Sequence, residues 1–300
     1  MEKLDDLLHH FGNNTRFSTA VVQAADSIVL STVKRALQLN LGTYRLYGNL
    51  VEIKEIAEEA GLDLNDSRLD VIHAPSAQDA AEQAVKDVRL GHAGILMKGS
   101  IQTADFLKAV LNKQNGIRSG KFLSHTALFE LPGYEKLLFL TDSAINITPG
   151  LEEKTVILEN AVKVANSVGI KKPKIAVLAA IESVNPTMPA TIDAACLTQM
   201  QNRGQLGNCL VDGPMAFDVA VSKEAAAQKK VASHVAGDAD ILLAPTLEAG
   251  NSLYKSFVYF AKAKVAGIIS GAQAPIVLVS RSDSAENRLY SLALAIRTTI

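Results

Sequence analysis

The chain has 300 residues, 48% of them hydrophobic, which is enough for one large or two medium domains. Its 30 basic and 31 acidic residues nearly cancel to a net charge of −1, so neither nucleic acid nor an anionic membrane is expected as a partner. The sequence shows no signal-peptide core and no run of about 18 uncharged apolar residues, so we expect neither export nor a membrane-spanning helix.

Short runs rich in β-branched residues or leucine alternate along the chain with longer helical patterns, which is typical of a parallel α/β architecture. In chain order, the predicted helices span residues 26–40, 51–61, 77–90, 104–112, 152–169, 191–201, 252–263 and 284–298. The predicted strands span residues 69–74, 94–97, 137–141, 174–180, 208–212, 240–244 and 276–280. Continuous apolar strands such as IAVLAA indicate burial on both faces of a sheet.

Residues 121–141 differ from this alternation, because two apolar segments are separated only by LPGYE. This pattern predicts a hairpin, or a crossing of the chain into a second sheet. No proline-rich or glycine-rich linker divides the chain, and no repeat of fixed period is visible. The sequence therefore predicts a domain boundary within this segment.

Five junctions between a predicted strand and the next helix are unusually polar. They lie at residues 98–103, 141–146, 182–186, 245–251 and 280–287. Each one alone can be explained by helix caps and turns, and Ser280 with Asp283 also fits a capping box. Together they favour a ligand site, because ligands of open α/β sheets bind beyond the carboxyl ends of the strands.

Two of these junctions point to an anion. The Lys98-Gly99-Ser100 loop and the Ser280-Arg281 pair each precede a predicted helix and offer cationic groups, hydroxyls and backbone N–H groups. This combination suits phosphate. The spacing matches neither GxxxxGK[ST] nor GxGxxG, which argues against a nucleotide-hydrolysing P-loop and the usual dinucleotide fingerprint.

The sequence offers little support for a nucleophile or a metal supplied by the protein. It has no GxSxG elbow, and its two cysteines, Cys196 and Cys209, are predicted to pack in the core. They lack CxxC spacing, which is typical of proteins of the reducing cytoplasm. The six histidines show no ligand spacing, so no protein-bound metal is expected. A substrate should therefore bring the nucleophile.

Six co-linear blocks resemble the phosphate acetyl/butyryl transferase family, and most of all its butyryltransferase branch, over residues 15–298. The blocks are MKGSIQT, SHTALFELPGYEKLLFLTDSAINITP, ESVNPTMPATIDAA, NCLVDGPMAFDVAVS, VAGDADILLAPTLEAGNSLYKS and SRSDSAEN. The resemblance implies two α/β domains with an interdomain cleft, similar to isocitrate and isopropylmalate dehydrogenases. The corresponding division of this chain is residues 1–134 plus 283–300 for the first domain and 135–282 for the second.

The resemblance also implies an activity. A short acyl group, butyryl or branched-chain, would move between coenzyme A and inorganic phosphate by direct attack in a ternary complex. Coenzyme A would be a substrate, no cofactor would be tightly bound, and the protein would be a cytoplasmic homodimer or higher homo-oligomer. The phosphate-binding and carbonyl-polarising pair of the family matches Ser280 and Arg281. Further candidates for binding substrate or phosphate are Lys98, Gly99, Ser100, Thr103, Thr141, Asn146, Glu182 and Glu248.

One position departs from the family pattern. In the acetyltransferase branch an Asp lies six residues after the site Arg and is the proposed base for the thiol, whereas this chain has Asn287 there. An amide cannot accept that proton, so Asp283 or Glu286 is predicted to replace it. Asp283 would share a helix face with Asn287, whereas Glu286 would point about 100° away.

Other functions remain open at this point. Phosphate acetyltransferase and acyl-carrier-protein:phosphate acyltransferase share the expected chemistry. A hydroxy-acid dehydrogenase would use the same fold, but the chain lacks an obvious Arg-rich substrate motif and a DxxxD metal pattern. A non-catalytic binding protein would explain Asn287, yet it gives no reason for the other site residues to be kept.

Overall fold

The structure is a computed structural model that describes residues 1–9, 17–119, 122–278 and 284–300. The chain forms two compact units. Unit 1 contains residues 1–4 and 122–265, and unit 2 contains residues 5–121 and 266–300. These boundaries differ from the predicted ones at 134/135 and 282/283. The reason is strand pairing: the segments on either side of residue 134 form one antiparallel pair, and the strand before residue 279 pairs within unit 2.

Unit 2 is built on a parallel sheet in the order β3-β2-β1-β4-β11, with β10 antiparallel to β11. Its strands are β1 (Ser18–Val22), β2 (Thr43–Gly48), β3 (Leu69–His73), β4 (Ile95–Lys98), β11 (Ile276–Val277) and, from Ala266 onward, β10 (Lys264–Ser270). The chain runs from β1 through β2 to β3 and then returns to place β4 on the other side of β1. The strand order therefore reverses between β1 and β4, the position at which open α/β sheets bind ligands.

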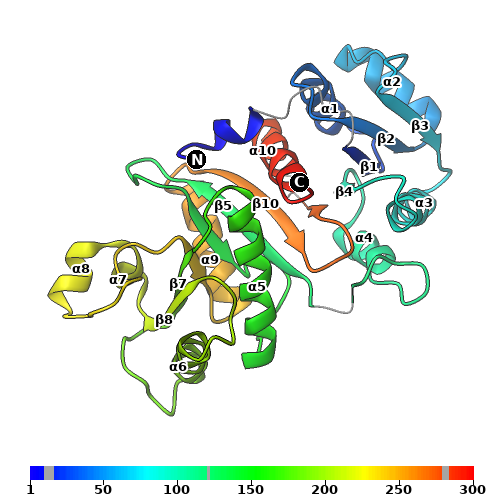
Figure 1. Ribbon diagram of the computed structural model, residues 1–300. Coiled ribbons are helices and arrows are strands. Elements are labelled where there is room, and N and C mark those ends of the chain that lie inside the picture. Colours follow the sequence, from blue (N-terminus) through cyan, green and yellow to red (C-terminus); the bar gives the residue numbers. More distant parts are fainter. Residues whose placement is uncertain (10–16, 120–121, 279–283) are drawn as a thin grey trace. The chain divides into compact units, whose positions relative to one another are not determined.

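The helices of unit 2 begin and end where the local sequence predicts. They are α1 (Ser27–Gln38), α2 (Leu50–Ala60), α3 (Ala77–Arg89), α4 (Thr103–Val110) and α10 (Ala285–Arg297), preceded by the 3-10 turn η1 (Leu4–Leu8). Asp26 and Asn49 cap α1 and α2 through their side chains, and Gly61 ends α2 in the left-handed conformation, with φ of 62°. Helix α10 packs against α1 (Figure 1). Its central residues, 288–296, are all buried.

Unit 1 has the strand order β5-β6-β9-β7-β8, in which only β5 and β6 are antiparallel. Its strands are β5 (Ser124–Glu130), β6 (Leu138–Thr141), β7 (Lys174–Leu178), β8 (Leu210–Met215) and β9 (Ile241–Leu243). Its helices are α5 (Leu151–Ser167), α6 (Pro189–Asn202), α7 (Phe217–Val221), α8 (Lys223–Gln228) and α9 (Leu247–Tyr259). The β5–β6 pair is the hairpin predicted around LPGYE. On one face of this sheet, Phe129 makes edge contacts with Tyr254 and Phe257.

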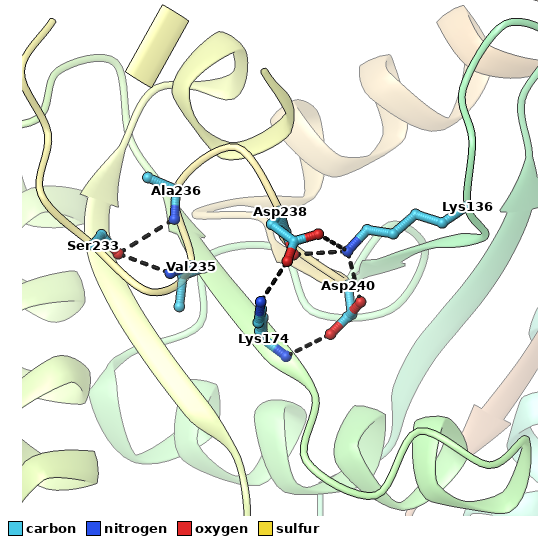
Figure 2. Close-up of polar contacts among 7 residues, drawn as sticks. All are labelled: Lys136, Lys174, Ser233, Val235, Ala236, Asp238 and Asp240. Carbon is cyan, nitrogen blue, oxygen red and sulfur yellow. Dashed lines mark hydrogen bonds and ion pairs between the residues drawn. The ribbon is translucent and has the colours of Figure 1, made fainter. Parts of the chain in front are cut away.

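Four charged residues join the amino-terminal ends of β6, β7 and β9 (Figure 2). The Lys136 ammonium donates to Asp238 and Asp240, at 2.8 Å in each case, and the Lys174 ammonium also donates to Asp238. The Lys174 backbone N–H donates to Asp240 at 2.8 Å. The cluster lies at the end of these strands that faces away from the polar junctions. It therefore fixes the strands that carry the unit 1 site residues.

Replacing Asp238 with asparagine should destabilise the protein at neutral pH by about 1 kcal/mol, a value reduced for solvent screening. Hydrogen bonds from Lys136 and Lys174 lower the Asp238 pKa from 3.8 to about 2. Because the folded-state pKa is depressed, this stabilisation is present above about pH 4 and is lost as the pH falls toward 2. Urea unfolding of both proteins from about pH 7 to about pH 3 measures the difference.

The exposed residue Glu55 on α2 supplies the control, since Glu55→Gln should leave the unfolding midpoint unchanged. A difference between wild type and Asp238→Asn that stays constant across the pH range would contradict the assignment of this carboxylate.

Candidate functional site

The carboxyl ends of β4 and β11 lie next to each other in unit 2. These strands are parallel neighbours, with Leu96 opposite Ile276 and Met97 opposite Val277. Lys98 ends β4, one residue beyond this register. Ser280, Arg281 and Asp283 follow β11 in the chain but lie outside the described residues. Their roles remain predictions, supported by the position of the strand that leads to them.

The Lys98–Ser100 loop is attached to the end of β1. The N–H groups of Gly99 and Ser100 donate to the carbonyls of Val22 and Gln23, both at 2.8 Å. A Cβ on Gly99 would lie 2.4 Å from the Gln23 carbonyl oxygen and 2.5 Å from that of Val22, so only glycine fits here. The Lys98 side chain is 4% exposed, and its ammonium donates to the Gly99 carbonyl at 3.3 Å. The loop thus holds a buried cation at the point where the strand order reverses.

The amino terminus of α4 completes this part of the site. Side chains cap α1, α2 and α3 at Asp26, Asn49 and Ser76, whereas the N-cap residue of α4, Gln102, makes no such bond in the described part of the chain. Thr103, the first residue of α4, is exposed. The first N–H groups of α4 are therefore not taken up by a cap at Gln102, and together with Lys98 they form an environment suited to an anion.

Helix α10 begins at Ala285, whereas the capping box predicted at Ser280 and Asp283 lies outside the described residues. Its N-cap is Ser284, whose hydroxyl accepts from the Asn287 N–H at 3.1 Å. Asp283 therefore precedes the cap. That Asp283 lies near Asn287 stays a prediction, because Asp283 is outside the described residues, and it rests on Asp283 directly following the Ser280-Arg281 pair in the chain.

The other two candidates on α10 differ in their surroundings. The exposed Glu286 carboxylate accepts from the Tyr290 hydroxyl at 2.8 Å, one turn along the helix, and that hydroxyl also contacts Asp5. Burial, together with these two carboxylates, raises the Tyr290 pKa. Asn287 is half-buried, and its backbone carbonyl accepts from the Ser291 hydroxyl at 2.8 Å. Glu286 is thus held against its own helix.

The predicted site residues of unit 1 lie at or after the carboxyl ends of the parallel strands β6, β7 and β9, and so toward one edge of that sheet. The Thr141 hydroxyl is buried and donates to the His125 carbonyl at 2.9 Å. The Asn146 amide donates to the Leu123 carbonyl at 2.8 Å. These two residues hold β6 and the loop after it against the segment around β5.

The two glutamates at this edge have different environments. Glu182 forms an ion pair with Lys229 at 2.9 Å, and the same ammonium reaches Asp218. Glu248 is exposed in the first turn of α9. Glu182 is therefore engaged within unit 1, whereas Glu248 points to solvent.

A buried carboxylate in unit 1 was not predicted as a site residue. Asp142 is 3% exposed and accepts from the Ala144 N–H at 2.8 Å and the Asn146 amide at 2.6 Å. A Cβ on Gly250 would lie 2.2 Å from the Asp142 carbonyl oxygen, so α9 approaches this turn as closely as glycine allows. The Asp-Ser-Ala sequence signals such an Asx turn, but the contact with Gly250 comes from a distant part of the chain.

The cysteines do not form a nucleophilic site. Cys209 is 1% exposed, and burial raises the pKa of its thiol, which disfavours the reactive thiolate. Cys196 is half-buried on α6. Across residues 1–9, 17–119, 122–278 and 284–300, no cluster of three or more His, Cys, Asp or Glu side chains is arranged to hold a metal ion. Within the same ranges, no helix has the length and apolar character needed to cross a membrane.

Comparison with known proteins agrees with these features. Probable phosphate butyryltransferase from Bacillus subtilis is 50% identical over 294 residues, which cover 98% of this chain and 97% of that protein. The crystal structure of a branched-chain phosphotransacylase from Enterococcus faecalis V583 superposes with a TM-score of 0.81 at 36% identity, over 94% of this chain and 98% of that one.

A more distant structure bears on the fold alone. A putative 4-hydroxythreonine-4-phosphate dehydrogenase from Salmonella typhimurium gives a TM-score of 0.57 at 14% identity, over 95% of this chain and 100% of that one. It confirms the dehydrogenase-like α/β fold. The family model described as phosphate acetyl/butaryl transferase matches residues 70–296, from β3 through most of α10. The chain therefore belongs to the phosphate acetyl/butaryl transferase family.

Proposed function

We propose that the protein transfers a short acyl group between coenzyme A and inorganic phosphate, with butyryl or a branched-chain acyl group preferred over acetyl. The observation that carries the activity is the buried Lys98 beside the amino terminus of α4, next to the strand that leads to Ser280 and Arg281. The preference for longer acyl groups rests on the butyryltransferase and branched-chain relatives, which share 50% and 36% of their residues with this chain.

The reaction needs no nucleophile from the protein. Toward acyl phosphate, a phosphate oxygen attacks the thioester carbonyl carbon, the C–S bond breaks and the coenzyme A thiolate leaves. In the other direction the thiolate attacks the acyl phosphate carbonyl, the C–O bond breaks and phosphate leaves. In this proposal Lys98, Ser100 and the first N–H groups of α4 hold the phosphate. Arg281 stabilises the negative charge that develops on the carbonyl oxygen.

Thiol release measured with DTNB on a panel of acyl-CoA substrates tests this function. We expect phosphate-dependent release of coenzyme A, fastest with butyryl-CoA, isobutyryl-CoA or isovaleryl-CoA. Fastest release with acetyl-CoA would assign the protein to the acetyltransferase branch. Activity with acyl carrier protein thioesters alone would indicate an acyl-carrier-protein:phosphate acyltransferase. Nicotinamide reduction with a hydroxy acid and a divalent ion would indicate a dehydrogenase. A complete lack of turnover would favour a binding protein.

Asp283 is proposed as the base that deprotonates the thiol, with Asn287 orienting the thiol or the acyl oxygen. Turnover toward acyl-CoA should then show an acid limb below neutral pH that disappears in Asp283→Asn, with a loss of about tenfold or more. A thiol that is activated without a protein base would instead give turnover that rises toward the thiol pKa of about 8.5 in both proteins.

Glu286→Gln is the matched comparison. Because the Glu286 carboxylate is engaged by Tyr290, this variant should retain the acid limb. Loss of the limb in Glu286→Gln but not in Asp283→Asn would transfer the role of base to Glu286. An unchanged pH profile of turnover in both variants would indicate that solvent deprotonates the thiol.

We also propose that the protein acts in the cytoplasm as a homodimer or higher homo-oligomer, without a tightly bound cofactor. The two cysteines are both free, which suits a reducing compartment. Light scattering on the purified protein measures its mass against the 31.9 kDa of one chain.

A further inference from the structure

Gln23 lies at the site but was not predicted from the sequence as a site residue. It directly follows β1, where the strand order reverses, and its carbonyl accepts from the Ser100 N–H at 2.8 Å. It thus joins the end of β1 to the loop that carries Lys98. Its backbone has φ of 52°, a left-handed conformation that is unfavourable for residues other than glycine. Such strain commonly persists where a side chain serves a function.

The Gln23 side chain is also incompletely satisfied. Its amide oxygen, Oε1, is buried and has no hydrogen-bond partner among the residues that the structure describes. A Cβ built on Gly48, at the end of β2, would lie 3.4 Å from this oxygen. The side chain therefore reaches from the end of β1 toward the end of β2, away from Lys98. A buried acceptor without a hydrogen-bond donor lowers the stability of the fold. A donor from outside the described residues would therefore satisfy Oε1.

The ends of β1 and β2 differ chemically from the end of β4. The first N–H groups of α1 and α2 are taken up by Asp26 and Asn49, so this part of the edge offers little to an anion. The first turns of these helices instead carry aliphatic side chains that are 39% exposed at Ile28 and 61% exposed at Val51. An anion suits the β4 end, whereas a neutral, partly apolar group suits the ends of β1 and β2.

We propose that Gln23 binds the pantetheine arm of acyl-CoA, with Oε1 accepting from one of its amide N–H groups or its hydroxyl. This inference rests on the proposed acyl transfer between coenzyme A and phosphate. Inorganic phosphate and acyl phosphate present chiefly acceptor oxygens and do not meet the need of Oε1. The pantetheine arm offers neutral donors and apolar methyl groups, which match the amide oxygen and the exposed side chains of Ile28 and Val51.

Two variants distinguish the role of the Gln23 side chain from that of its left-handed backbone. Gln23→Gly removes the amide and suits the left-handed backbone, so the carbonyl contact with Ser100 should persist. Gln23→Met keeps the length of the side chain but lacks the hydrogen-bonding groups. Both should raise the KM for butyryl-CoA about three- to tenfold, the range of one neutral hydrogen bond. The KM for phosphate should change less than twofold.

Lys262→Gly is the matched control, because Lys262 is also left-handed, with φ of 55°, and is exposed in unit 1. It should leave both KM values unchanged. Butyryl-pantetheine, which lacks the nucleotide, should show the same ratio between wild type and Gln23→Gly as butyryl-CoA does.

The outcomes are distinguishable. Unchanged KM values for butyryl-CoA, or equal increases for butyryl-CoA and phosphate, would overturn the role of Gln23 while the acyl transfer stands. An effect that vanishes with butyryl-pantetheine would also overturn it, since the contact would then lie on the nucleotide. Absence of turnover in the wild-type protein would instead remove the proposed function itself.

Discussion

Replacing Arg281 with alanine should lower turnover about 10²- to 10³-fold, the effect of removing a donor that stabilises developing negative charge. The chain supports this role indirectly, because β11, which leads to Arg281, runs parallel to β4 beside the buried Lys98. Thiol release at saturating butyryl-CoA and phosphate measures the loss. Arg281→Lys should recover little of it, since a point charge cannot replace a planar fork that binds through two hydrogen bonds.

Arg35→Ala provides the comparison, because Arg35 is exposed on α1 and bonds to Gln38 on its own helix. This variant should keep wild-type turnover. If Arg281→Ala behaved like Arg35→Ala, the residues after β11 would be a connecting loop and not an anion site.

Gly99→Ala should lower both stability and turnover. The added Cβ would meet the carbonyl oxygens of Gln23 and Val22 at 2.4 and 2.5 Å, and neither backbone atom can move aside as a flexible side chain could. Overpacking of this kind costs about 1–3 kcal/mol. Displacement of Lys98 and Ser100 by about 1 Å can reduce turnover by about 10²-fold. Urea unfolding and thiol release measure the two losses.

Gly94→Ala is the matched control in the same unit. Gly94 immediately precedes β4, and a Cβ there would meet nothing within 4 Å. The control should retain turnover and lose little stability. A Gly99→Ala protein with normal turnover would show that the loop tolerates displacement, and would weaken the case for Lys98 as a phosphate ligand.

Most helices could be predicted from sequence, although the short helices α7 and α8 were not. The patterns predicted α1 and α10 to within two residues at each end, because caps such as Asp26 and an amphipathic spacing are local signals. Strands β1, β2 and β10 were not predicted. β2 reads TYRLYG, and the burial of Tyr44 and Tyr47 depends on tertiary partners.

Those partners explain why β2 could not be predicted from the local sequence. The Tyr44 hydroxyl donates to the Leu41 carbonyl at 3.0 Å, and the Tyr47 hydroxyl donates to Asp87 on α3 at 2.5 Å. Burial raises the pKa of both phenols. A segment with two tyrosines becomes a buried strand only when such acceptors are supplied from elsewhere in the fold.

The site was predictable in part for similar reasons. Lys98, Gly99 and Ser100 form a local motif at a strand end, so their sequence alone pointed to an anion. The attachment of Ser100 to Gln23 joins segments far apart in the chain, and no local pattern signals it. Ser280 and Ser284 both fit the local capping pattern, and the N-cap of α10 at Ser284 follows only from where the helix begins.

The discontinuity of unit 2 determines the order in which the protein can fold during synthesis. Nearly all of unit 1 comes from one continuous segment, residues 122–265, which leaves the ribosome before residues 266–300. Unit 2 needs residues 266–300 for β11, which pairs with β4, and for the buried α10. Unit 1 can therefore fold on a growing chain, whereas the part of the sheet beside Lys98 is finished only after residues 266–300 have been made. An incomplete chain would thus carry a folded unit 1 without a complete phosphate site.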